Sequence, residues 1–277
     1  MTQQIVNIRD IADRYDAVVF DQWGVLHDGS TPYPGAIAAI EALKSSGQLI
    51  AVLSNSGKRA ASNAKRISDF GFGDAFNVVM TSGEALWRKF HDSAFQQNKL
   101  FPIQRSDGDA AAWAEGLSFD FTDITQAQGV LLMGLPDGST ETAFAAELDH
   151  ALAAGLPLYC SNPDKLSPRA NGETVISPGT LAHAYQDKGG TVAFFGKPHR
   201  PIFGILQDEL GAAKLLMVGD SLEHDIAGGA NAGWDTLLIQ GGLYREAFDQ
   251  KDAQTVLTSL CDTYDAPRPT FRMDTLT

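Results

Sequence analysis

The sequence has few cysteines and no long hydrophobic run. Its two cysteines, Cys160 and Cys261, form no CxxC pair among the 277 residues, so we expect free thiols in a reducing compartment and place the protein in the cytoplasm. No segment approaches the roughly 18 uninterrupted apolar residues of a membrane span. The N-terminal stretch MTQQIVNIRDIADRYD carries charges where a secretory signal needs apolar residues.

Basic residues are also in deficit. The chain has 21 of them against 34 acids, for a formal charge of −13, which argues against nucleic acid or an anionic membrane as partner. A small anionic substrate is not excluded, because a bound cation can invert the local field. The loops GxGxxG and GxxxxGK[ST] and the metal motif HExxH are absent from the sequence, which leaves dinucleotide, P-loop and zincin chemistry without support.

What is present is an alternation of apolar runs and helical patterns. Short, wholly apolar runs are typical of strands buried on both faces of a parallel sheet. Three of them end at polar residues, namely residues 17–20 before Asp21, 49–53 before Ser54, and 215–218 before Gly219-Asp220. Helical patterns cover residues 36–44, 59–69 and 202–210. The alternation predicts a doubly wound, Rossmann-like α/β sheet, in which ligands bind beyond the carboxyl ends of the strands.

The middle of the chain has the same character. Residues 100–103, 129–133 and 156–160 are predicted strands, and residues 141–152 a predicted helix. We therefore expect a core domain over 1–83 and 178–277 with a smaller α/β domain, 84–177, inserted into it. The tail, residues 266–277, is predicted to pack as an edge strand.

Four segments offer chemistry at the predicted sheet edge. Asp21 could attack phosphorus, and Gly24 permits a tight turn after it. Ser54 and Asn55 offer donors to phosphate oxygens, although an N-cap for the next helix is an alternative. Lys197, in Gly196-Lys197-Pro198-His199, follows the apolar run of residues 192–195, a further predicted strand. It offers a positive charge to a phosphoryl group or stands simply on the surface.

Acids in the fourth segment suit a hard cation. Asp220 and Asp225 lie in one turn-to-helix stretch, and magnesium prefers oxygen ligands. A bound cation there could polarise phosphoryl oxygens for in-line attack. The alternative is a helix-capping Asp220 and a solvated Asp225.

In order and context, FDQWGVL, LSNS, FGKPH and MVGDSLEHDIAGG resemble the four motifs of the haloacid dehalogenase (HAD) superfamily. The resemblance covers residues 17–83 and 178–240. It implies a Mg²⁺-dependent hydrolase in which Asp21 is nucleophile and metal ligand. Ser54 would bind the phosphoryl group, Lys197 would stabilise its charge, and Asp220 would bind the metal, with Asp225 as an inner or outer ligand.

The predicted insertion occupies the position of a C2 cap. Its SNPD sequence, residues 161–164, resembles the TNPD element of class IIA caps, a branch that includes p-nitrophenyl-phosphatase-like enzymes. The resemblance implies that Asn55 and Asn162 or Asp164 help to frame the substrate. It leaves open whether the protein is a homodimer and which phosphorylated metabolite it takes.

One residue departs from the family pattern. Phosphatases of this superfamily carry a second Asp two positions after the nucleophile, where it serves as acid and base, and this chain has Trp23. The backbone carbonyl of Trp23 could still bind Mg²⁺, but indole cannot exchange a proton near neutral pH. Another group, such as His27, Asp28 or Glu223, could act instead, or the leaving group could need no protonation.

The remaining alternative is a catalytically weak protein that binds a phosphate ester or regulates through it. A dehalogenase would also lack the second Asp, but halide displacement by a carboxylate needs no metal, so Asp220 and Asp225 weigh against it. Trp23 could stack on an aromatic or sugar substrate, or be a buried packing residue. We expect a phosphatase acting through an aspartyl-phosphate on Asp21.

Overall fold

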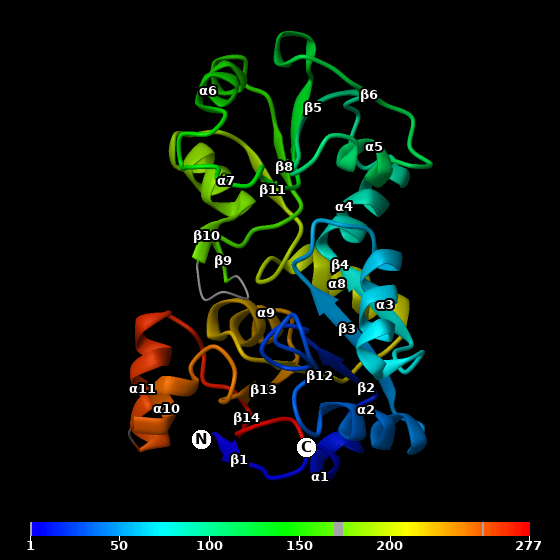
Figure 1. Cartoon of the computed structure of the whole chain (residues 1–277), viewed down its shortest axis with the longest axis vertical. Helices are drawn as coiled ribbons and strands as arrows, with labels where there is room; N and C mark the ends of the chain where they lie inside the picture. Colours follow the sequence, from blue (N-terminus) through cyan, green and yellow to red (C-terminus); the bar gives the residue numbers. More distant parts are fainter. Residues whose placement is uncertain (1, 169–173, 251) are drawn as a thin grey trace. The chain divides into compact units, whose positions relative to one another are not determined.

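A computed structural model describes residues 2–168, 174–250 and 252–277 of the chain, which form two compact units (Figure 1). The core unit comprises Met1–Ser54, Ala61–Met80 and Lys197–Thr277. The inserted unit comprises Asn55–Ala60 and Thr81–Gly196. The predicted insertion therefore lies within the second unit.

The core unit is built on a sheet with the order β1-β14-β13-β12-β2-β3-β4. Within the described residues its strands are β1 (Gln3–Gln4), β2 (Ala17–Phe20), β3 (Leu49–Ser54), β4 (Val78–Thr81), β12 (Leu215–Gly219), β13 (Asp235–Ile239) and β14 (Phe271–Met273). The central strand β2 pairs in parallel with both β3 and β12. All four residues of β2 are buried, as expected for a strand covered on both faces.

Helical segments complete the core unit. They are α1 (Arg9–Ala12), α2 (Ala36–Ser45), α3 (Ala60–Ile67), η1 (Ser68–Phe72), α8 (Arg200–Leu210), η3 (Leu222–Ile226), α9 (Ala227–Asn231), α10 (Arg245–Gln250) and α11 (Ala253–Thr263). Helix α8 ends at Gly211 in a left-handed conformation (φ 60°), which glycine adopts without strain. Ile40 and Leu43 of α2 are fully buried and join Phe20 in the core.

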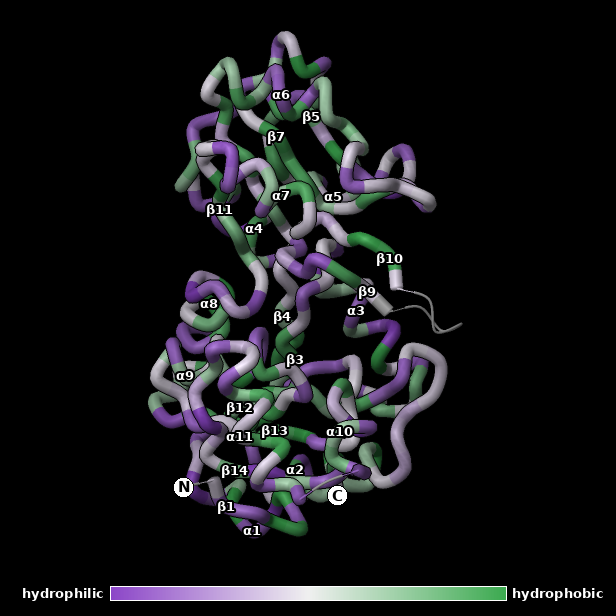
Figure 2. Tube along the Cα trace, turned by 90° about the vertical axis from the view of Figure 1, so that its left-hand side faces the viewer, coloured by the Kyte–Doolittle hydropathy of each residue, from purple (hydrophilic) through white to green (hydrophobic). Residues whose placement is uncertain are grey.

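The inserted unit has its own parallel sheet, with the order β11-β8-β7-β5-β6. Its described strands are β5 (Lys99–Ile103), β6 (Asp120–Phe121), β7 (Gly129–Leu132), β8 (Leu158–Cys160) and β11 (Val192–Phe194), and β9 (Leu166–Pro168) pairs antiparallel with β10 (Thr174–Ile176). Its described helices are α4 (Ser82–His91), α5 (Asp109–Trp113), η2 (Ile124–Gln126), α6 (Ala145–Ala153) and α7 (Pro178–Asp187). The hydrophobic colouring along β7 marks the centre of this second sheet (Figure 2).

The structure differs from the sequence-based boundaries in several places. Residues 55–60 and 81–83, predicted to be core, belong to the inserted unit. Residues 178–196 belong to the inserted unit rather than to the core, because β11 pairs with β8 and α7 packs on the same sheet. The tail forms β14, but this strand is not at the edge, since β1 pairs with its outer side. The differences at residues 178–196 and at the tail come from pairing partners far away in sequence, which a local pattern does not reveal.

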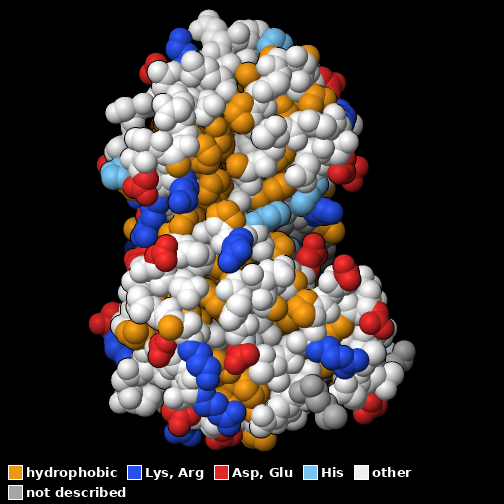
Figure 3. Space-filling model, turned by 180° about the vertical axis from the view of Figure 1, so that it is seen from behind, with side chains coloured by type: hydrophobic (Ala, Val, Ile, Leu, Met, Phe, Trp, Pro, Cys, Tyr) orange, Lys and Arg blue, Asp and Glu red, His pale blue; other side chains and the backbone are white. Residues whose placement is uncertain are grey.

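Surface charge is mixed on the face shown in Figure 3, where acidic and basic side chains are interspersed. Among the described residues, no helix has the length and apolar character needed to cross a membrane.

Candidate active site

Three strands of the core sheet end side by side at the candidate site. Phe20 of β2 is in register with Val52 of β3 and with Val218 of β12. The parallel register therefore brings Asp21, Ser54 and Asp220, each at or just beyond the end of its strand, to one edge. This is the edge at which open α/β sheets bind their ligands.

Carboxylates and one ammonium gather at this edge. Ligand oxygens of Asp21, Asp220 and Asp225 all lie within 4.8 Å of one another. The Nζ of Lys197 donates to Oδ1 of Asp21 at 2.6 Å and to Oδ1 of Asp225 at 2.7 Å. The Lys197 side chain is only 3% exposed, so these two ion pairs are largely shielded from water.

The electrostatics show a surplus of negative charge. Burial is the largest cause that raises the pKa of Asp21, to about 6, against the opposing effect of Lys197. Burial, with Asp21 and Asp225 nearby, raises the pKa of Asp220 well above its usual value. Burial alone would lower the pKa of Lys197, but its two carboxylate partners outweigh it and raise this pKa. Three acids thus share one buried cation, an arrangement that favours a further positive charge.

Glycines let the backbone approach these acids. A Cβ on Gly24 or on Gly242 would overlap the carboxylate of Asp220, and one on Gly219 would overlap that of Asp225. Gly24 also has φ 79°, which confirms the predicted tight turn after the first strand. The peptide that carries the Trp23 carbonyl therefore runs directly beside Asp220.

Two acids of the group differ in their contacts. Asp225 uses both oxygens, accepting from Lys197 with Oδ1 and from the Ser221 N–H with Oδ2 at 3.0 Å. Asp220 accepts from the Leu243 N–H at 2.9 Å. Sequence reasoning did not predict the contact of the loop with Gly242 and Leu243, because a backbone N–H is present in almost every residue type. The only sequence signal was a Gly-Gly pair after a strand.

The structure places Lys197 differently from the sequence-based expectation. The apolar run before it, β11, belongs to the sheet of the inserted unit and not to the core sheet. Lys197 itself belongs to the core unit, three residues before the start of α8. Its position is set by its contacts with Asp21 and Asp225 rather than by a core strand.

Trp23 is partly exposed, at 37%, and is not a buried packing residue. A Cβ on Gly29 would overlap its indole, and the ring of His27 lies edge-on at a centroid distance of 6.4 Å. His27 is fully buried, its Nδ1 accepts from the Gly29 N–H at 3.0 Å, and burial lowers its pKa to about 4. His27 is therefore neutral and shielded, and a poor substitute for the missing acid.

The other two substitutes are no better placed. The Asp28 carboxylate is occupied by the N–H groups of Ser30 and Thr31, each at 2.8 Å, and these bonds lower its pKa. Glu223 is an exposed residue of η3. Neither residue belongs to the acidic group of Asp21, Asp220 and Asp225.

The expected substrate-framing residues gather in the inserted unit. Asn55 Nδ2 donates to Oδ1 of Asp164 at 2.6 Å, and the Asp164 N–H donates to Oδ1 of Asn162 at 3.1 Å. A Cβ on Gly196 would overlap Pro163 and crowd Asn55. The segment after Ser54 is thus held against the SNPD turn.

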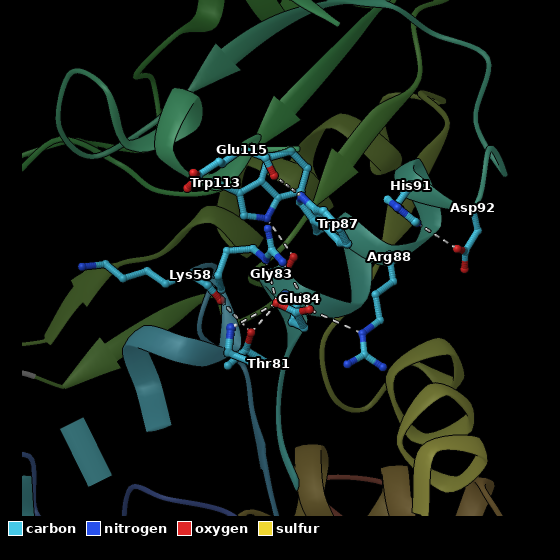
Figure 4. Close-up of polar contacts among 12 residues, drawn as sticks. Lys58, Thr81, Gly83, Glu84, Trp87, Arg88, His91, Asp92, Trp113 and Glu115 are labelled. Atoms are coloured by element: carbon cyan, nitrogen blue, oxygen red, sulfur yellow. Dashed lines mark hydrogen bonds and ion pairs between the residues drawn. The ribbon is translucent and has the colours of Figure 1, made fainter. Parts of the chain in front are cut away.

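Glu84 also fixes this segment (Figure 4). Its carboxylate accepts from Arg59 Nε at 2.6 Å and from the Ala60 N–H at 3.2 Å, and it also pairs with Arg88 at 3.4 Å. The Arg59 guanidinium lies 3.8 Å from the ring centroid of Trp87. Residues 55–60 are therefore tied into the inserted unit by charge-assisted hydrogen bonds and a cation–π contact.

Two protein-family models match this sequence. Residues 18–117 match the family described as haloacid dehalogenase-like hydrolase, and residues 194–263 match one described as HAD-hydrolase-like. Together they span more than half of the chain and include Asp21, Lys197 and Asp220. The chain belongs to the haloacid dehalogenase-like hydrolases. The predicted family is confirmed.

Individual proteins are also similar to this chain over most of its length. Chronophin from Bos taurus is 26% identical over 251 residues, covering 85% of this chain and 84% of the relative. Glycerol-3-phosphate phosphatase from Homo sapiens is 26% identical over 257 residues, covering 82% of this chain and 79% of the relative. A solved haloacid dehalogenase-like hydrolase from Brucella suis 1330 has a TM-score of 0.81 at 28% identity. The match covers 99% of this chain and 100% of the solved chain. The predicted α/β fold of this HAD-like hydrolase is confirmed.

Proposed function

We propose that this HAD-like hydrolase is a magnesium-dependent phosphatase, which hydrolyses a small phosphorylated metabolite through a phosphorylated Asp21. The observation that carries the proposal is the grouping of Asp21, Asp220 and Asp225 within 4.8 Å, with Lys197 bound to two of them. The similarity to human glycerol-3-phosphate phosphatase supports hydrolysis of a phosphate ester.

The donor set suits magnesium. It consists of oxygen ligands, which Mg²⁺ prefers, and its negative charge exceeds that of the single ammonium. Asp21, Asp220 and the backbone carbonyl of Trp23 would hold the ion, and Asp225, whose oxygens are both engaged, would act as an outer ligand. When bound, Mg²⁺ neutralises charge and polarises the phosphoryl oxygens.

The side chains divide the remaining work. An oxygen of Asp21 attacks phosphorus, and the leaving group departs with the electrons of the broken P–O bond. Lys197 stabilises charge on the phosphoryl group and orients Asp21 through its 2.6 Å hydrogen bond. Ser54, at the end of β3, donates its hydroxyl to a phosphoryl oxygen. Water then hydrolyses the aspartyl-phosphate and regenerates Asp21.

The inserted unit serves as the cap in this proposal. Caps close over a site and exclude water during the first step. Asn162 would help to frame the substrate. Asn55 and Asp164, which bind each other at 2.6 Å, would instead hold the backbone that follows Ser54.

The test is turnover of p-nitrophenyl phosphate with and without magnesium. We expect activity in the wild-type protein that EDTA abolishes, and loss of activity in Asp21→Asn with an unchanged circular dichroism spectrum. The matched control is Asp74→Asn, since Asp74 is a fully exposed acid of the core unit. Equal turnover by wild type and Asp21→Asn would remove Asp21 from the mechanism.

A further inference from the structure

We propose that this enzyme prefers aryl phosphates, whose leaving group is a weakly basic aryloxide with a planar ring. We further propose that Trp23 and Leu243 contact this ring. The inference rests on the proposed function, because it concerns the substrate of the same site. Its physical basis is the lack of a well-placed acid in the described core unit, together with two exposed apolar residues in segments that contact Asp220.

Attack by Asp21 forms one P–O bond and breaks another, so the leaving oxygen takes up an electron pair. An alkoxide is a strong base and must be protonated as it leaves, whereas an aryloxide is stable enough to depart as the anion and take its proton from solvent. The second step expels the carboxylate of Asp21, also a weak base, while the attacking water loses a proton to solvent. Neither step of aryl phosphate hydrolysis needs an acid from the protein.

The described core unit offers no well-placed acid for an alkoxide. Lys197 is 3% exposed and its ammonium is directed at Asp21 and Asp225. His27 is fully buried and its Nδ1 is occupied by the Gly29 N–H. The position two residues after Asp21 carries an indole, which is neither acid nor base near neutral pH.

Exposed apolar residues instead lie in the two segments that contact Asp220. Among the described residues, few large hydrophobic side chains are exposed, and two of them come from segments that touch Asp220. Trp23, 37% exposed, precedes Gly24, which packs against the Asp220 carboxylate. Leu243, 61% exposed, donates its N–H to the same carboxylate.

The Trp23 indole is also held in place before any ligand arrives. A Cβ on Gly29 would overlap it, and His27 packs against it edge-on. A fixed, partly exposed ring suits stacking against another ring, because little side-chain entropy is lost on binding. The Trp23 indole is therefore better suited to bind a planar aromatic group than a flexible polyol.

The test compares four substrates with magnesium: p-nitrophenyl phosphate, phenyl phosphate, acetyl phosphate and glycerol 3-phosphate. We expect wild-type kcat/KM to fall by at least about 100-fold from p-nitrophenyl phosphate to glycerol 3-phosphate, the usual contribution of general acid catalysis. Trp23→Asp should raise kcat/KM for glycerol 3-phosphate far more than for p-nitrophenyl phosphate.

Stacking is tested separately. Trp23→Ala and Leu243→Ala should each raise KM for p-nitrophenyl phosphate by about threefold to tenfold. Both should leave KM for acetyl phosphate near its wild-type value, because its leaving group, acetate, is a weak base without a ring. Trp23→Phe, which keeps a ring, should restore most of the loss and shows that the position tolerates replacement.

The outcomes are distinguishable. Similar wild-type kcat/KM for p-nitrophenyl phosphate and glycerol 3-phosphate would overturn the inference and leave the phosphatase proposal intact. Equal effects of Trp23→Ala on acetyl and p-nitrophenyl phosphate would overturn the role of the ring. Absence of wild-type turnover with all four compounds would overturn the proposed function and this inference with it.

Discussion

The ammonium of Lys197 lies 2.6 Å from Oδ1 of Asp21, although 176 positions separate the two residues in sequence. The same ammonium lies 2.7 Å from Oδ1 of Asp225, which is fully buried. One cation therefore compensates two acids in a site with little water, where removing it leaves both uncompensated.

Lys197→Met should lower kcat/KM for p-nitrophenyl phosphate by on the order of 100-fold or more, because the charge aimed at the nucleophile and phosphoryl group is lost. The variant should also unfold at lower urea concentration, since breaking a buried ion pair costs roughly 3–5 kcal/mol. Lys44→Met, at an exposed pair with Asp74, is the matched control and should change neither quantity appreciably. A Lys197→Met enzyme with near wild-type kinetics would contradict the assigned role.

Gly24→Ala should abolish stabilisation of the protein by magnesium, because its Cβ would overlap the Asp220 carboxylate. The control is Gly47→Ala, at nearly the same positive φ (82° against 79°) but with nothing within 4 Å. Both variants should lose about 1–2 kcal/mol from left-handed strain, and Gly24→Ala should lose more because of the overlap with Asp220. Only Gly47→Ala should keep the rise in Tm with magnesium, measured by differential scanning calorimetry. An equal magnesium response in both variants would argue against a metal beside Asp220.

Glu84→Gln should destabilise the inserted unit by about 1–3 kcal/mol near neutral pH, the usual range for hydrogen bonds to a charged group. Burial raises the pKa of Glu84, but hydrogen bonds from Arg59 and the Ala60 N–H outweigh it, so the pKa is lowered from 4.5. A lowered folded-state pKa means that the stabilisation is complete above 4.5 and disappears as pH falls through the folded-state value.

Urea unfolding at several pH values checks this prediction. The difference in free energy of unfolding between wild type and Glu84→Gln should become smaller as pH falls below 4.5. Glu115→Gln, at an exposed acid of the same unit, is the control and should track wild type throughout. A difference in free energy of unfolding that does not change with pH would show that the Glu84 charge does not stabilise the segment of residues 55–60.

Sequence reasoning captured the features that local pattern encodes. Apolar runs form β2, β12 and all of β3 except Ser54, and the parallel register of these strands aligns Asp21, Ser54 and Asp220 at one edge. The register confirms this part of the fold. Roles of individual residues stay predictions, since geometry alone assigns no chemistry.

What the sequence could not supply depends on distant partners. The run before Lys197 has the composition of a core strand, and only its pairing with β8 assigns it to the inserted unit. The Leu243 N–H contact with Asp220 involves a backbone group that every residue except proline has. The Trp23 indole lies close to Gly29 and edge-on to His27, and sequence composition does not encode these contacts.

The most direct test of the central claim is acid quenching of the enzyme during turnover of p-nitrophenyl phosphate with magnesium, followed by peptide mass spectrometry. The account predicts one phosphoryl group on the peptide that carries Asp21, absent from Asp21→Asn and from samples without magnesium. A phosphoryl group on another residue, or rapid turnover with an unmodified Asp21 peptide at every quench time, would contradict it.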